Sequence, residues 1–229
     1  LVTAQLESAQ AGRLHLVVSG RGERASIEVS LAGRFNADNL LAALSARLVV
    51  GETLAALTER VGRLKAPPGR MESFRIGSGM TAVVDYAHTA DALENVLASL
   101  RETLPEGASL GVVFGAGGDR DPGKRPLMGA VAERLADWVI VTSDNPRSEA
   151  PEAIIEAIVA GMSEQAPIER IIDRREAIAV GIRRLAAGRA GDCLLIAGKG
   201  HETGQEIGGE ILPFDDRRVV REQAREVAA

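Results

Sequence analysis

The chain is poor in cysteine and in aromatic residues, and each shortage excludes a class of protein. Cys193 is the only cysteine among 229 residues, so the sequence offers neither a disulfide pair nor a cysteine-rich metal cluster. Its position in the apolar run CLLIAG predicts a small buried strand residue. Aromatic residues make up only 3% of the chain, which leaves few rings for stacking nucleic-acid bases.

Charge and hydropathy set further limits. The 32 acidic and 27 basic residues give a net charge of -5 and are spread along the sequence, so no basic stripe faces a phosphate backbone and we expect no nucleic-acid partner. No apolar run approaches the roughly 18 residues of a membrane span, and no charged-then-apolar signal segment opens the sequence. We expect a cytoplasmic protein without a membrane partner. Because the sequence starts at Leu1, without Met and in a strand-like pattern, we also expect a piece of a longer polypeptide.

The first third of the chain predicts a small α+β unit. Residues 13–31 alternate apolar and polar on both sides of SGRGE, which is the pattern of a β-hairpin. Apolar residues at helical spacing follow in NADNLLAALSARLVV, behind Asn36 as a candidate cap, and again in ETLAALTERVGRL. The two prolines and the glycine of KAPPGR, residues 65–70, then predict a linker.

After the linker, strand and helix patterns alternate. Five runs rich in Val and Ile lack the alternation of half-exposed strands and predict the buried strands of a parallel sheet. These runs are residues 81–85, 109–115, 138–143, 168–173 and 193–198. Helical patterns lie between them, and Pro126 and Pro151 suit the first turns of two helices. The order strand, helix, strand predicts an α/β fold with a doubly wound sheet.

Four loops are expected at the carboxyl ends of these strands, where open α/β sheets bind their ligands. They read DYAHTAD, GAGGDRDPGKRP, SDNPRSEAP and GKGHETGQ, and all four are rich in charged residues. This clustering favours a binding site over a chance collection of surface charges. In the first loop, Asp85 at a strand end and His88 near a helix start are placed to hold the ribose or polar edge of a nucleotide.

The second loop nearly matches a phosphate-binding P-loop. Gly118, Gly123 and Lys124 have the spacing of G-x-x-x-x-G-K. Arg125 follows where a P-loop needs Ser or Thr to hold magnesium, and the planar guanidinium of Arg120 matches a carboxylate. The loop therefore predicts a carboxylate-bearing substrate better than a triphosphate. A glycine-rich turn with solvated charges is the alternative.

The third and fourth loops add complementary charges and close backbone approach. Asp144 can bind an ammonium and Arg147 a carboxylate, with an Asn-Pro turn between them. Such a pair suits the zwitterionic end of an amino acid, although a surface turn with an ion pair would use the same residues. In GKGHETG, Gly198 and Gly200 allow the backbone to approach a ligand closely.

In order and spacing, six stretches resemble the carboxy-terminal part of a Mur ligase, and more narrowly the type that adds meso-diaminopimelate (MurE). They are GRFNADNLLAA, PPGRME, VVDYAHTADALENVL, GAGGDRDPGKRPLMG, TSDNPRSE and AGKGHE, which together span residues 33–202. The resemblance implies a Rossmann-like, mostly parallel carboxy-terminal domain over residues 67–229. It implies that residues 1–66 are the tail of the central ATPase domain.

The resemblance implies an ATP-dependent acid–amino-acid ligase of peptidoglycan synthesis. The expected small-molecule partners are meso-diaminopimelate, UDP-MurNAc-L-Ala-D-Glu (UDP-MurNAc-dipeptide) and ATP, with Mg²⁺ bound mainly by the central domain, and we expect a monomer. No G-x-x-x-x-G-K-[ST] motif occurs in these 229 residues, so we expect the chain alone to be inactive. One departure is Ala90, which replaces the proline of the usual DYAHTPD.

The resemblance also implies residue roles. The DNPR motif marks enzymes that select meso-diaminopimelate over L-lysine, and it is intact here. The implied diaminopimelate contacts are Arg120, Asp144, Asn145, Pro146, Arg147, Gly198 and Glu202. The implied ATP contacts are Asn39, Arg70, Asp85 and His88. No catalytic residue and no metal ligand is assigned within the chain.

Other functions fit parts of the pattern. A nucleotide-dependent oxidoreductase would share the sheet, but Arg120 stands where G-x-G-x-x-G needs its third glycine after Gly115 and Gly117. A pure interaction module would not need four charged loops at one edge. Within the family, an L-lysine-adding ligase is disfavoured by Arg147, because its guanidinium suits a second carboxylate that lysine lacks.

Overall fold

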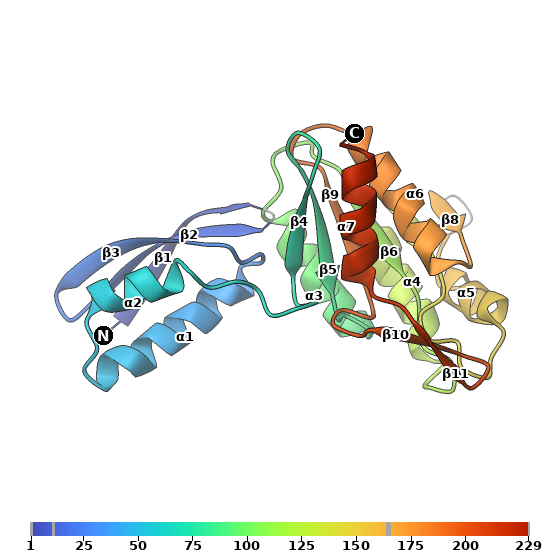
Figure 1. Ribbon diagram of the computed structural model, residues 1–229, viewed down its shortest axis with the longest axis horizontal. Coiled ribbons are helices and arrows are strands. Elements are labelled where there is room, and N and C mark those ends of the chain that lie inside the picture. The colour runs from blue at the N-terminus through green and yellow to red at the C-terminus, as the bar shows by residue number, and fades with distance from the viewer. Residues whose placement is uncertain (1, 11, 164–165, 229) are drawn as a thin grey trace.

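The amino-terminal part of the chain is a three-stranded sheet covered by two helices (Figure 1). The computed structural model describes residues 2–10, 12–163 and 166–228. Strands β1 (Val2–Gln10), β2 (Arg13–Gly20) and β3 (Glu23–Val29) pair antiparallel in sequence order. The hairpin predicted over residues 13–31 is therefore confirmed, and β1 adds a third strand to it.

Helices α1 (Phe35–Val49) and α2 (Leu54–Val61) bury their apolar faces against this sheet and form a core of their own. In α1 the apolar side chains recur every three or four residues, as at Leu40, Leu44 and Leu48, so they share one face. The prediction that Asn36 caps this helix is wrong. The helix begins at Phe35, and the side-chain amide of Asn36 instead donates a hydrogen bond to the carbonyl oxygen of Ala32.

The predicted linker lies directly against the second part of the chain. Gly69 has a φ of 64°, and a Cβ on it would clash with the backbone of Gly200, so only glycine fits this close approach. Two residues later, the Met71 amide donates to Oδ2 of Asp85 at 2.9 Å. The linker is thereby fastened to two of the four predicted loops.

The second part of the chain is built on a six-stranded sheet in the order β4-β5-β9-β6-β7-β8. The strands are β4 (Glu72–Ile76), β5 (Met80–Asp85), β6 (Leu110–Phe114), β7 (Trp138–Val141), β8 (Ile168–Arg170) and β9 (Cys193–Ala197). Only β4 runs antiparallel to its neighbour, so the predicted mostly parallel α/β sheet is confirmed. Cys193 is fully buried in β9, as predicted.

Helices cover both faces of this sheet (Figure 1). One face packs against α3 (Ala90–Arg101), α4 (Lys124–Leu135) and α5 (Pro151–Val159), and the other against α6 (Arg174–Ala186) and α7 (Asp216–Glu226). Pro151 opens α5 and Pro126 lies in the first turn of α4, as predicted. Among the described residues, no helix has the length and apolar character needed to span a bilayer.

This winding brings the loops after β5, β6, β7 and β9 to one edge of the sheet. A small hairpin, β10 (Gly204–Ile207) and β11 (Glu210–Pro213), follows the loop after β9. It contacts the loop after β7 through a parallel bridge between Arg147 and Ile207. The predicted site edge is thus partly covered by an element that the sequence analysis did not predict.

Candidate functional site

The loops after β7 and β9 are joined by a triangle of polar side chains. Asn145 Nδ2 donates to Glu202 Oε2 at 2.9 Å. Lys199 Nζ donates to Asn145 Oδ1 at 2.8 Å and to the same Glu202 oxygen at 3.0 Å. Because Lys199 is fully buried, these contacts form the inner wall of the site rather than its surface.

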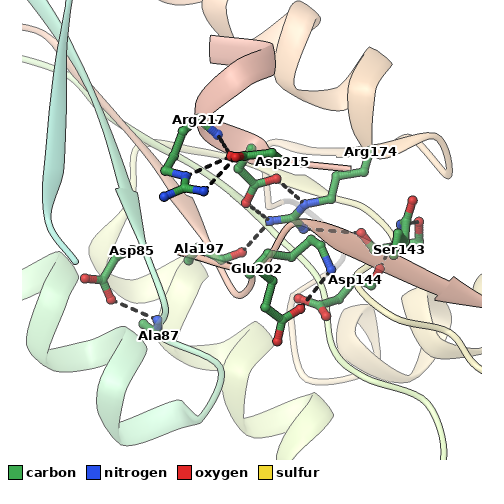
Figure 2. A network of polar contacts seen from close by, with 12 residues as sticks. Asp85, Ala87, Ser143, Asp144, Arg174, Ala197, Glu202, Asp215 and Arg217 are labelled. Atoms are coloured by element: carbon green, nitrogen blue, oxygen red, sulfur yellow. Dashed lines mark hydrogen bonds and ion pairs between the residues drawn. The ribbon is translucent and has the colours of Figure 1, made fainter. Parts of the chain in front are cut away.

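Asp144 is a buried acceptor beside this triangle. Its residue is 7% exposed, and among the described residues no donor reaches its Oδ2 atom. Gly198 lies directly against it, because a Cβ on Gly198 would clash with Oδ2 and its φ of 118° favours glycine. Figure 2 shows Asp144 and Glu202 in the region around Arg174, whose guanidinium interacts with both carboxylates. A buried carboxylate oxygen without a donor is costly, so the negative charge of Asp144 favours a cationic group bound nearby.

Arg147 contributes the opposite charge from the same loop as Asp144. Its Nε donates to Glu206 Oε2 at 2.8 Å, and its Nη1 donates to the carbonyl oxygen of Gly118 at 2.7 Å. These bonds use two of the five guanidinium N–H groups. The backbone of Arg147 has a φ of 54°, an uncommon conformation for a non-glycine residue that often accompanies functional sites.

The loop after β6 brings Arg120 next to Arg147. Both side chains border Gly117, whose added Cβ would lie 3.0 Å from Arg147 Nη1 and 3.7 Å from Arg120 Cγ. The two loops are fastened together by Asp119, which accepts hydrogen bonds from the backbone N–H and the hydroxyl of Ser148. The structure therefore brings all seven predicted diaminopimelate contacts to one edge, while their role in binding stays a prediction.

The near-P-loop is organised around a buried arginine rather than a phosphate. The Arg125 guanidinium donates to both carboxylate oxygens of Glu149 at 2.9 and 2.7 Å, and to the carbonyl oxygen of Gly117 at 3.3 Å. Lys124 Nζ donates to the carbonyl oxygen of His88 at 2.8 Å, and burial lowers its pKa. Arg125 thus ties the glycine-rich turn to the start of α5, through a partner, Glu149, that the sequence analysis did not predict.

A buried ion pair behind the site also escaped the sequence analysis. Arg174 and Asp216 are both fully buried, and the guanidinium donates to the two carboxylate oxygens at 2.8 and 2.7 Å. The same guanidinium donates to the carbonyl oxygens of Ser143 at 3.2 Å and Ala197 at 3.0 Å (Figure 2). One side chain therefore holds the ends of β7 and β9, immediately before the two loops that carry most of the site.

The surrounding charges keep Glu202 ionised. Burial alone would raise the pKa of Glu202, but hydrogen bonds from Asn145 and Lys199 and the positive charge of Lys199 outweigh it and hold this pKa below its ordinary value. The guanidinium of Arg174 lies close enough to interact with both Asp144 and Glu202. The site thus combines carboxylates with flanking cations, which suits a zwitterionic ligand.

Three of the four residues predicted to lie near ATP line a cavity. This cavity, of about 710 Å³, lies between α1, the linker and α3, and Asn39, Arg70 and Asp85 line it. Its volume is in the range of small-molecule sites. His88 does not line this cavity; it is exposed, with Nδ1 2.9 Å from the carbonyl oxygen of Tyr86. In residues 2–10, 12–163 and 166–228, no three metal-ligating side chains gather at this or any other point.

Two of these cavity residues also have structural contacts. The carboxylate of Asp85 accepts hydrogen bonds from the Met71 and Ala87 amides at 2.9 and 2.8 Å. Burial nevertheless raises the pKa of Asp85, because it outweighs these bonds and the nearby charge of Arg70. The Arg70 guanidinium lies 4.7 Å from the centre of the Tyr86 ring.

Comparison with known proteins shows the family to which the chain belongs. A family model described as Mur ligase, glutamate ligase domain, matches residues 69–200. A UDP-N-acetylmuramoyl-L-alanyl-D-glutamate--2,6-diaminopimelate ligase from Chromobacterium violaceum is 48% identical over 210 residues, which is 91% of this chain and 42% of that protein. The ligase of the same name from Mesorhizobium japonicum is 48% identical over 213 residues, covering 93% of this chain and 42% of its own length. The chain thus spans less than half the length of these curated relatives.

Solved structures agree with the fold. A diaminopimelate ligase of the same name has a TM-score of 0.74 and 42% identity, over 97% of this chain and 44% of that chain. The UDP-N-acetylmuramate-alanine ligase of Thermotoga maritima, with a TM-score of 0.60 over 98% of this chain and 45% of its own, shares only 20% identity and shows the fold alone. The resemblance inferred from the six sequence stretches is therefore confirmed, and the chain belongs to the Mur ligase family.

Proposed function

We propose that this chain is the amino-acid-binding half of an ATP-dependent ligase that joins meso-diaminopimelate to UDP-MurNAc-L-Ala-D-Glu in peptidoglycan synthesis. The relatives' names supply both substrates. The observation that carries the proposal is the joining of the loops after β7 and β9 through Asn145, Lys199 and Glu202. Gly198 packs against Asp144, and Arg147 lies on the same loop as Asp144.

The charges of this edge match the ligand. Each end of meso-diaminopimelate carries an ammonium or amine and a carboxylate. Asp144 and Glu202 are the acceptors for an ammonium, and Arg147 with the neighbouring Arg120 supplies donors for a carboxylate. L-lysine lacks the second carboxylate, so it would leave the guanidinium of Arg147 without that partner. This difference is the basis that we propose for selecting diaminopimelate.

In the proposed reaction, this chain binds and orients the attacking amine. ATP supplies the phosphoryl group that converts the D-glutamate γ-carboxylate into an acyl phosphate. The diaminopimelate amine then attacks the acyl carbon, an amide forms, the amine loses a proton, and inorganic phosphate leaves. Holding the two reactants in attack geometry can supply about 7–11 kcal/mol of the barrier.

We propose that Asn39, Arg70 and Asp85 contact ATP in the cavity of about 710 Å³, with His88 beside it. Mg²⁺ would then be held mainly by phosphate oxygens and by residues of the central domain. We also propose that residues 1–66 are the tail of that ATPase domain and residues 67–229 the amino-acid-binding domain, and the separate cores of the two parts support this division. We place the enzyme in the cytoplasm as a monomer.

Arg147 provides the test of this function. In the ligase that contains this chain, Arg147→Ala should raise KM for meso-diaminopimelate about 10- to 100-fold, because a charge-assisted contact to a carboxylate is lost. Arg147→Lys should restore part of the loss, since it keeps the charge but not the planar fork. The matched control is Arg134→Ala on the outer part of α4, whose ion pair with Glu94 is about half exposed. Unchanged KM and turnover in Arg147→Ala would refute the function.

A further inference from the structure

Lys199 is a buried cation at the centre of the site that the proposed function does not use. Its side chain is fully buried, which is rare for lysine unless the ammonium is paired. The pairing is specific, with Asn145 Oδ1 at 2.8 Å and Glu202 Oε2 at 3.0 Å. A fully buried ammonium cannot touch a ligand itself, so any effect on binding must pass through these two partners.

The contacts of Glu202 are one-sided. Within the described part of the chain, the hydrogen bonds to the Glu202 carboxylate all involve Oε2, which accepts from both Lys199 and Asn145. The side chain is 33% exposed. Lys199 therefore fixes one carboxylate oxygen on the inside and leaves Oε1 as the oxygen for a ligand.

Asn145 is fixed in the same way. Its Oδ1 accepts from Lys199 Nζ and from the backbone N–H of Glu206 at 3.0 Å, while its Nδ2 donates to Glu202. Both ends of the amide are therefore assigned, so the side chain has a single favoured orientation. Without the ammonium, Oδ1 would lose its charged donor and the amide could turn.

The local charges show why a cation is needed here. The guanidinium of Arg174 interacts with both Asp144 and Glu202, the two carboxylates that are expected to bind the ligand ammonium. Lys199 and His201 on its own loop and Arg174 from α6 face Glu202, and Arg174 and Lys124 face Asp144. Of these cations, Lys199 donates directly to Glu202. It therefore supplies positive charge directly to a site that carries two carboxylates.

We propose that Lys199 is the positioning residue of the amino-acid site: its buried ammonium holds Asn145 and Glu202 in their binding orientation and lets Glu202 and Asp144 face one ligand ammonium together. This inference rests on the proposed function and deepens it. Lys199 itself contacts neither the substrate nor the reacting atoms.

The first test uses Lys199→Met, which keeps the length of the side chain and removes the charge. In the ligase that contains this chain, KM for meso-diaminopimelate should rise about tenfold to a hundredfold, while KM for ATP stays unchanged. Lys199→Arg should restore part of the loss, because it returns a cation to the same place. Lys65→Met, at an exposed lysine of the linker, is the matched control and should leave both constants unchanged.

The second readout is the pH dependence of KM for meso-diaminopimelate between about pH 5 and pH 8. In the wild type the pKa of Glu202 lies below its ordinary value, so the carboxylate stays ionised over this range. In Lys199→Met, the hydrogen bond and the positive charge of Lys199 are lost while the Asn145 hydrogen bond remains, so the pKa of Glu202 rises relative to the wild type. Binding should then weaken as the pH falls, an effect that a purely structural lysine would not produce.

The outcomes distinguish a failure of the role of Lys199 from a failure of the proposed function. A folded Lys199→Met ligase with unchanged KM and an unchanged acid limb overturns the role of Lys199, while a raised KM in Arg147→Ala measured alongside leaves the proposed function standing. If Arg147→Ala is also unchanged, the function itself fails. Where Lys199→Met does not fold, Lys199→Gln decides, because it removes the charge but keeps a hydrogen-bond donor: a raised KM for meso-diaminopimelate supports the role, and an unchanged KM with an unchanged acid limb contradicts it.

Discussion

Arg125 distinguishes the glycine-rich loop after β6 from a phosphate-binding P-loop. It occupies the position where a P-loop carries Ser or Thr, and its guanidinium is almost fully buried against Glu149. The backbone around it is therefore fixed by an internal ion pair and by the Gly117 carbonyl oxygen. Because this internal ion pair occupies both Nη atoms of Arg125, we expect the loop not to bind a triphosphate as a P-loop does.

Arg125→Ser completes the sequence pattern of a P-loop and tests this view. We expect no gain in ATP affinity, and we expect the chain to lose about 1–3 kcal/mol of unfolding free energy. The lower part of this range allows for Glu149, which is one-third exposed and partly screened by solvent. Urea unfolding and a calorimetric ATP titration measure the two effects.

The control for this variant lies on the same helix. Arg134→Ser removes an ion pair with Glu94 in which both side chains are about half exposed, and it should change stability by less than about 0.5 kcal/mol. Tight ATP binding by Arg125→Ser, or a stability equal to the wild type, would contradict the role given to Arg125.

At the scale of whole elements, the Arg174–Asp216 pair joins two helices to two strands. Arg174 is the first residue of α6 and Asp216 the first of α7, and the guanidinium also bonds to carbonyl oxygens at the ends of β7 and β9. The packing of α7, far along the chain, is thereby linked to the loops that carry Asp144 and Gly198.

Asp216→Asn should be strongly destabilising, because it leaves the guanidinium of Arg174 buried without a counter-charge. We expect a loss of about 3–5 kcal/mol, measured by urea unfolding. The double variant Arg174→Met with Asp216→Leu should recover part of this loss, since it removes both buried charges. Glu222→Gln, at a carboxylate of α7 that pairs with Arg175 and Arg218 near the surface, should cost far less. A cost that small for Asp216→Asn would show that the pair does not hold these elements together.

Periodicity predicted the core elements but not the peripheral ones. The runs that became β5, β6, β7 and β9 are almost entirely buried, so their composition had to be apolar. The elements that sequence analysis missed carry little of this signal. β11 is exposed over its whole length, β4 is a partly buried edge strand, and α7 has only Val219 and Val220 as apolar residues near its start.

In the site, likewise, the positions of the loops were predicted but the contacts between their side chains were not. The expectation that the four loops lie at one edge of the sheet is confirmed, because it depends only on strand order, while ligand binding by these loops stays a prediction. Strand order could not select the partners, since contacts such as Arg125 with Glu149 join residues 24 positions apart and Asn145 with Glu202 join residues 57 apart. The pairing of Arg147 with Glu206 escaped prediction for the same reason.

At the scale of the whole molecule, the chain is a two-part structure with a cavity at the junction. The three-stranded sheet has its own core, and the linker joins it to the six-stranded sheet beside the residues predicted to contact ATP. The chain covers 42% of the length of two relatives, and its 229 residues contain no complete P-loop. The phosphate chemistry of the proposed reaction therefore needs residues that this chain does not supply.

We accordingly expect the 229-residue chain alone neither to hydrolyse ATP nor to form the amide product. Phosphate release and product formation can be followed with meso-diaminopimelate, UDP-MurNAc-L-Ala-D-Glu, ATP and Mg²⁺ present together. The full-length relative from Chromobacterium violaceum serves as the positive control in the same assay. Measurable ligase activity from the purified chain would show that the phosphate chemistry does not need residues outside this chain.

The central claim is that the loops after β6, β7 and β9 together bind an amino acid that carries a second carboxylate. A crystal structure of the ligase containing this chain, with meso-diaminopimelate bound, measures this most directly. We expect a ligand carboxylate within about 2.7–3.2 Å of the Arg147 guanidinium and a ligand ammonium against Asp144 and Glu202. Diaminopimelate bound away from these loops, with Arg147 still paired only to Glu206, would contradict it.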